Sequence, residues 1–268
     1  MAGSTTAGAT RPSRRGLRLF LGLFALVLVA AGVWVGVGFL TLTSSQVHRS
    51  FPVAGARLVI DAQGGMVRIT AGRAGVVEVD RRLRNDSLRK PRPFERLQGE
   101  TLILRDGCPR SGVMIYCDAR YDLRVPPDLN LIRVVNRSGG VSAGGLTGPL
   151  DLQGDSGAIT VDGATRPLRL RTSDAAIRAT NLRSTDVQAS TTSSGIMLGF
   201  LVAPERVDAH TSDASIRLTV PGGSGPYAVQ QHTSDGTTSI QVKTDPAATR
   251  RLVLRTSYGN IVVQPAGR

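Results

Sequence analysis

The chain is poor in aromatic residues, and also in the cysteines and histidines from which metal centres are built. Aromatic residues make up 4% of its 268 residues, and there are two cysteines and three histidines. No pair of cysteines or histidines completes the four ligands of a structural zinc site, so we expect no metal and no other cofactor. The 31 glycines and 14 prolines disfavour long helices, and together with many Val, Thr and Ser residues they predict an all-β chain.

Acidic residues are also scarce, and the formal net charge is +13. Arg11, Arg14, Arg15 and Arg18 precede the first long apolar stretch, which leaves 13 − 4 = +9 for the rest of the chain. A basic body attracts nucleic acid, anionic lipid headgroups or acidic wall polymer. Of these partners we expect no nucleic acid, because the apolar stretch predicts export from the cytoplasm.

Residues 19–42 contain no charged side chain and predict one transmembrane helix, since about 20 helical residues cross the ~30 Å hydrocarbon core. By the positive-inside rule the short basic tail, residues 1–18, stays in the cytoplasm and the body lies outside the cell membrane. Residues 43–50 are expected to be a linker. The alternative to a signal anchor is a cleaved signal peptide, because Val29-Ala30-Ala31 is a passable cleavage site.

The only cysteines, Cys108 and Cys117, lie nine residues apart in a stretch with Gly and Pro nearby. In an oxidising compartment they can form a disulfide that closes a hairpin-sized loop, and the alternative is two unpaired thiols.

One pattern recurs over residues 131–268, in which a short alternating apolar run leads through a Ser, Asp or Gly turn into a second run. Each copy contains one aliphatic anchor, and the anchors are Val141, Ile159, Ile177, Ile196, Ile216, Ile240 and Ile261. Successive anchors are 18, 18, 19, 20, 24 and 21 residues apart, which is too short for a two-helix repeat. This spacing predicts a β-solenoid, in which each repeat packs on its neighbours.

The alternation also assigns side chains to faces. Leu168 and Leu170 are expected to point inward with Ile177, while Arg169 and Arg178 point to solvent. Residues 51–130 are less regular and are interpreted as the beginning of the same sheets. Within them, residues 81–96 are expected to form an exposed basic loop.

These features resemble the bacterial "putative adhesin" family, extracytoplasmic β-solenoid domains related to the toast-rack domains of cell-envelope stress proteins. The resemblance rests on Tyr121-Asp122-Leu123-Arg124-Val125-Pro126, on Leu129-Asn130-Leu131, and on the Ser-Gly or Ser-Asp turns between Asn136 and Gly259. It implies the architecture and an envelope location, and it supplies no catalytic residue.

Two sets of side chains are candidate sites. His210 and His232 both precede Thr-Ser-Asp, so in a regular solenoid they would lie about 4.8 Å apart on neighbouring rungs, with Asp213 and Asp235 stacked beside them. Such a ladder could bind a metal or serve in acid-base chemistry, but the favoured explanation is that outward positions beside turns tolerate any hydrophilic residue. The second candidate is a basic stripe that could bind acidic envelope polymer or lipid headgroups, formed by Arg133, Arg169, Arg171, Arg178, Arg217 and Arg255. The alternative is that these are solvated arginines, which protect an exposed sheet from aggregation.

The sequence therefore favours a noncatalytic, membrane-anchored scaffold for adhesion or other contacts in the cell envelope. Its expected partners are the membrane and acidic wall polymer, anionic lipid or another envelope protein. One alternative is a sensory or regulatory ectodomain that works through a membrane partner. Another is an enzyme that acts on wall glycan.

Overall fold

The computed structural model describes residues 23–30, 32, 43–53, 55–85, 91–108 and 117–267. The chain divides into two units, Met1–Thr43 and Ser44–Arg268. In the first unit residues 23–30 are helical, and the described residues include no helix that is long and apolar enough to cross a membrane. The predicted tail, residues 1–18, and most of the predicted span, residues 19–42, lie outside the described residues.

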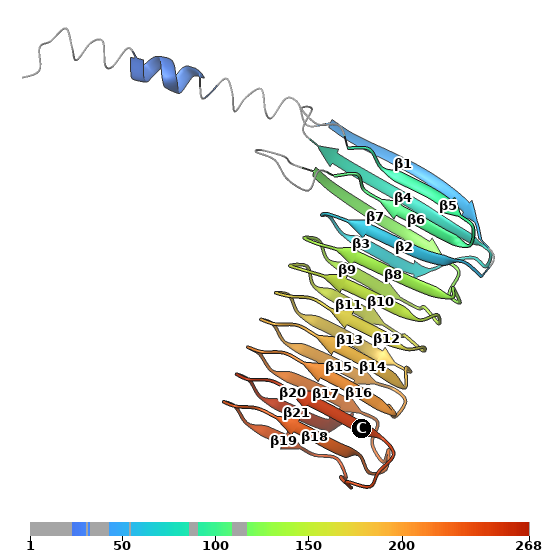
Figure 1. Ribbon diagram of the computed structural model, residues 1–268, viewed down its shortest axis with the longest axis vertical. Coiled ribbons are helices and arrows are strands. Elements are labelled where there is room, and N and C mark those ends of the chain that lie inside the picture. Colours follow the sequence, from blue (N-terminus) through green and yellow to red (C-terminus); the bar gives the residue numbers. More distant parts are fainter. Residues whose placement is uncertain are drawn as a thin grey trace, which may run out of the picture. The chain divides into compact units, whose positions relative to one another are not determined.

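The second unit consists of two facing sheets of short strands (Figure 1). In spatial order, the eleven-stranded sheet contains β1 (Thr43–Pro52), β4 (Val76–Asn85), β7 (Cys117–Val125), β3 (Val67–Ala71), β9 (Val141–Gly144), β11 (Ile159–Asp162), β13 (Ile177–Leu182), β15 (Ile196–Phe200), β17 (Ile216–Val220), β21 (Ile261–Pro265) and β19 (Thr238–Ile240). The ten-stranded sheet contains β18 (Ala228–His232), β20 (Arg251–Arg255), β16 (Arg206–His210), β14 (Asp186–Ser190), β12 (Leu168–Arg171), β10 (Leu150–Gly154), β8 (Leu131–Asn136), β2 (Arg57–Ala62), β6 (Thr101–Arg105) and β5 (Phe94–Gln98).

Each repeat is a rung of two strands, one in each sheet, and the rungs stack with parallel pairing. β10 and β11, for example, pair with β12 and β13 of the following rung. The predicted alternation is confirmed, because Leu168, Leu170 and Ile177 are buried between the sheets while Arg169 and Arg178 are exposed. The aliphatic side chains of successive rungs form one continuous core.

In four rungs a buried threonine ties the turn to the turn of the neighbouring rung. Thr211 is 0% exposed, and its hydroxyl donates to the carbonyl oxygens of Ser194 at 2.9 Å and Thr192 at 3.3 Å. Equivalent bonds are made by Thr172, Thr191 and Thr256. The Thr-Ser-Asp turns are therefore explained by backbone pairing between rungs.

The last two rungs are stacked in the reverse of their sequence order. β20 lies between β16 and β18, and β21 lies between β17 and β19 (Figure 1). The chain thus skips one place, builds the end rung β18/β19, and returns to fill the gap with β20/β21. Residues 221–227 and 241–250 make the two connections, and they account for the long anchor spacings of 24 and 21 residues.

The hydrophobic effect explains why the last two rungs exchange places in the stack. Leu254 and Ile261 of the inner rung are 0% exposed, whereas Gln231 and Thr238, which lie in register with them, are exposed. Burying an amide without a partner costs about 1–3 kcal/mol, so the aliphatic rung takes the inner place and the polar rung caps the stack. Ile240 was therefore wrongly predicted as an anchor, because Thr238 occupies that place.

The N-terminal end is also out of sequence order. β2/β3 lies between β6/β7 and β8/β9, and β4 and β5 add to β7 and β6 in antiparallel fashion. Residues 43–50, predicted as a linker, lie within β1. The exposed loop predicted for residues 81–96 was also wrong at both its ends, since β4 continues to Asn85 and β5 begins at Phe94.

Two charged residues lie inside this end of the solenoid, where they form a buried ion pair. The Arg81 guanidinium of β4 donates to the Glu95 carboxylate of β5, and their side chains are only 8% and 2% exposed. Arg49 of β1 approaches the second Glu95 oxygen at 3.3 Å. Burial beside this pair raises the pKa of the Tyr121 hydroxyl. The pair joins the two sheets where the aliphatic column ends.

Candidate interaction surfaces

The predicted histidine ladder is interrupted by an arginine. In the ten-stranded sheet His210 is in register with Arg255, and Arg255 is in register with His232. The two histidines are therefore two strand spacings apart, about 9.6 Å, and not on neighbouring rungs as predicted. The histidines are separated because the exchange of the last two rungs inserts β20 between β16 and β18.

The predicted pair of aspartates is separated in the same way. The Tyr258 N–H donates to the Ser212 carbonyl at 2.8 Å, and Tyr258 bridges to Asp235 on its other side. Tyr258 consequently lies between Asp213 and Asp235 in the column of turns. Tyr258 was not singled out in the sequence, although the other turns of the repeat region have Ser or Asp in its place.

The predicted basic stripe is divided between two outward faces that point in opposite directions. The ten-stranded sheet carries Arg133, Arg169, Arg171 and Arg255, and the eleven-stranded sheet carries Arg178 and Arg217. Part of the stripe is also compensated, because Asp151 lies in register between Arg133 and Arg169 and is 3.7 Å from Arg133.

A denser basic surface arises where β20 lies beside β16. Arg206 is in register with Arg251, and His210 is in register with Arg255, and all four side chains are exposed. Asp208 is the only carboxylate on either strand, and it makes a loose ion pair of 3.9 Å with Arg255. On the neighbouring strand β14, Asp186 lies in register with Arg206. We call the four basic residues the basic face, and together with Asp208 and Asp186 its charge is 3 − 2 = +1 with His210 neutral.

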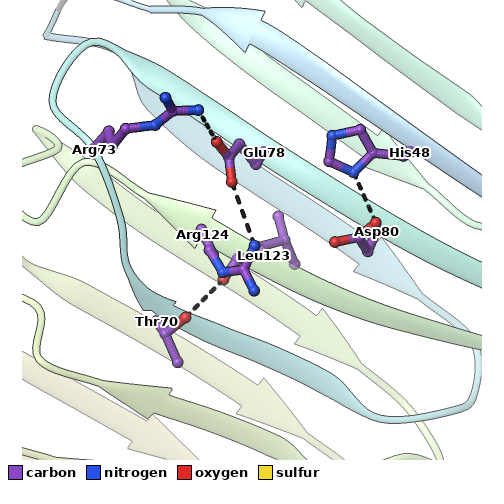
Figure 2. Close-up of polar contacts among 7 residues, drawn as sticks. All are labelled: His48, Thr70, Arg73, Glu78, Asp80, Leu123 and Arg124. Carbon is purple, nitrogen blue, oxygen red and sulfur yellow. Dashed lines mark hydrogen bonds and ion pairs between the residues drawn. The ribbon is translucent and has the colours of Figure 1, made fainter.

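A second charged surface covers β4, β7 and β3 near the N-terminal end (Figure 2). Glu78 accepts a hydrogen bond from Arg73 at 2.5 Å and lies 3.5 Å from Arg124, and the Arg73 bond is the main cause that lowers the pKa of Glu78. On the same strand Asp80 is 2.8 Å from His48 of β1. Because these acids already have basic partners, this surface is a network of internal pairs.

The predicted disulfide between Cys108 and Cys117 is confirmed. Before it, the buried Asp106 carboxylate accepts N–H bonds from Gln63 at 2.5 Å and Cys108 at 2.9 Å. Burial nevertheless raises the pKa of Asp106. The carboxylate orders the chain where β6 leads into the disulfide loop.

The described side chains form neither a metal cluster nor a nucleophile elbow. In the described ranges no group of three or more His, Cys, Asp or Glu residues is placed to hold a metal ion. Residues 140–144 match the Gly-x-Ser-x-Gly pattern of a nucleophile elbow, which requires a sharp strand-to-helix turn. Here Ser142 instead lies within β9, paired with Arg68 and Thr160 of the flanking strands.

This stack of two-stranded rungs defines the molecule as a parallel β-solenoid. The chain belongs to the Toastrack DUF4097 family, whose model matches residues 126–263. No curated protein matches the chain.

The solved structures that match the chain include three bacterial proteins. A putative cell adhesion protein from Clostridium sporogenes is 9% identical with a TM-score of 0.46, covering 83% of this chain and 100% of its own. A putative adhesin from Bacteroides fragilis is 17% identical with a TM-score of 0.46, covering 82% and 97%. A putative adhesin from Parabacteroides merdae is 10% identical with a TM-score of 0.41, covering 83% and 97%.

Proposed function

We propose that the protein is a noncatalytic interaction scaffold of the cell envelope, anchored in the cell membrane by residues 19–42 with the solenoid outside. The uncharged stretch after four arginines supports the anchor and its orientation. The Cys108–Cys117 disulfide supports an oxidising compartment. The stacked rungs supply a rigid surface on which side chains keep a regular spacing.

The basic face is the observation that carries the choice of partner. Arg206 and Arg251 extend from adjacent strands in register, so the two side chains leave the sheet about 4.8 Å apart. Two cations at such a spacing attract neighbouring anionic groups of one polymer, for instance the phosphodiesters of an acidic wall polymer. We therefore assign this face to an anionic envelope polymer.

The test compares two double variants that remove the same charge from opposite faces. Full-length protein in detergent micelles is titrated with polyphosphate as the probe, using R206Q/R251Q and the control R178Q/R217Q. One unit charge at 4 Å contributes about 1 kcal/mol in water, so R206Q/R251Q should bind about 30-fold more weakly at low salt. The difference should vanish near 1 M salt, where the Debye length is about 3 Å.

Equal binding by the two double variants at low salt would refute the assignment to the basic face. A parallel titration with vesicles of anionic phospholipid distinguishes the polymer from the membrane surface. Preference for the vesicles, with polyphosphate ignored, would replace the polymer by lipid headgroups.

A further inference from the structure

The exchanged rungs place six exposed side chains at one corner of the solenoid. Where the strands of the ten-stranded sheet end, His210, Arg255 and His232 follow one another in register. In the adjoining turns the order is Asp213, Tyr258 and Asp235, and all six side chains are exposed. We call these six residues the corner patch.

Tyr258 has no structural reason to be aromatic. Its side chain is 63% exposed and is the only exposed aromatic one in the described part of the second unit. Its N–H donates to Ser212 O at 2.8 Å, as the N–H of Ser193 donates to Ser173 O at 3.1 Å in another rung. A serine thus makes the same turn. The Tyr258 ring therefore presents an apolar face to solvent that the fold does not require.

The groups around the ring combine acceptors and donors at nearly zero net charge. The turns that carry Asp213 and Asp235 lie on either side of the Tyr258 turn, each one strand spacing of about 4.8 Å away. Arg255 adds donors beside them, and with neutral histidines the charge is −2 + 1 = −1. Such a patch favours neither a polyanion nor a polycation. It suits a ligand with an apolar face and many hydroxyl groups, which is the chemistry of a sugar ring.

We propose that the corner patch binds a neutral polysaccharide, with one pyranose ring stacked on Tyr258 and its hydroxyl groups bonded to Asp213 and Asp235. The backbones of the two aspartates are about 9.6 Å apart along the stack, comparable with a disaccharide unit. This inference deepens the scaffold function, on which it rests for the envelope location.

The test is a titration of the full-length chain in detergent micelles, with ring-labelled tyrosines observed by NMR. The probes are chitotetraose and cellotetraose, which differ in their N-acetyl groups. We expect the Tyr258 resonances to shift with a millimolar Kd that does not change between 0.1 and 0.5 M NaCl. Y258S should weaken binding at least tenfold, and D213N/D235N severalfold. The matched control D174N, which changes an equivalent turn outside the patch, should bind like the unaltered protein.

Two results would overturn the proposal. One is that neither tetrasaccharide shifts the Tyr258 resonances at 10 mM, and the other is that Y258S binds them as tightly as the unaltered chain. The outcome is separable from that for the basic face, because R206Q/R251Q leaves the corner patch intact and Y258S leaves the basic face intact. R206Q/R251Q should lose polyphosphate binding and retain oligosaccharide binding. Y258S should lose oligosaccharide binding and retain polyphosphate binding, so the two proposals are tested independently.

Discussion

Leu254 and Gln231 occupy equivalent inward places on the last two rungs. Replacing each residue by the other, in the separate variants L254Q and Q231L, tests why those rungs are stacked out of order. Leu254 is 0% exposed, and Gln231, its neighbour in register, is exposed at the end of the stack. L254Q loses about 1.5–3 kcal/mol of side-chain burial, and its unpaired amide adds about 1–3 kcal/mol. We therefore expect a loss of about 3–5 kcal/mol in the free energy of unfolding.

Q231L changes an exposed side chain, so its effect should stay within about 0.5 kcal/mol. The assay is the midpoint of thermal unfolding, where each kcal/mol corresponds to about 2–4 °C for a domain of this size. L254Q should lower the midpoint by about 10 °C and Q231L by almost nothing. If the rungs were stacked in sequence order, Gln231 would be inside and Leu254 at the end. A mild L254Q together with a strongly stabilising Q231L would refute our explanation.

Three further predictions concern buried polar groups. T211V should lower the free energy of unfolding by about 1 kcal/mol, measured by urea unfolding, whereas T211S keeps the hydroxyl and should cost less. E95Q leaves the Arg81 charge buried without its partner and should cost about 3–5 kcal/mol, while R49Q, at the exposed end of the cluster, should cost less than about 1 kcal/mol. Equal losses for E95Q and R49Q would contradict the buried pair. The raised pKa of Asp106 means that the native state retains a proton above pH 3.8, the ordinary value. Stability should therefore fall as the pH rises from 3.8 through the raised pKa, and D106N should lack this slope when the two unfolding curves are subtracted.

The interior of each rung was predictable because alternation by two is a local property. Leu168 and Leu170 lie two residues apart, so the pattern assigns both to the core without knowledge of any other rung. The Cys108–Cys117 disulfide was predictable because the chain has only these two cysteines and they lie nine residues apart. The all-β fold and the family resemblance follow from the same local signals.

The order of the rungs was not predictable from the same pattern, because alternation assigns faces and not neighbours. Two signals pointed to the exchange. One was the 24-residue spacing before Ile240, and the other was the polar pair Gln231 and Thr238 at inward places. The candidate histidine ladder was wrong because it assumed sequential stacking. The antiparallel additions at the N-terminal end have no repeat signal, so Arg81 was assigned to a loop although Glu95 pairs with it inside.

The most direct test of the exchanged rungs is disulfide formation between engineered cysteines on the outward face. Asp208 is in register with Val253, and Val253 with Gln230. Neighbouring strands place Cα atoms about 4.8 Å apart, within the range of a disulfide, whereas two strand spacings exceed its ~7 Å limit. The native cysteines are already bonded to each other. On mild oxidation D208C/V253C should form a disulfide and D208C/Q230C should not, as read by mass spectrometry of non-reduced peptides. A disulfide in D208C/Q230C and none in D208C/V253C would show that β18 lies beside β16, and would contradict both the basic face and the corner patch.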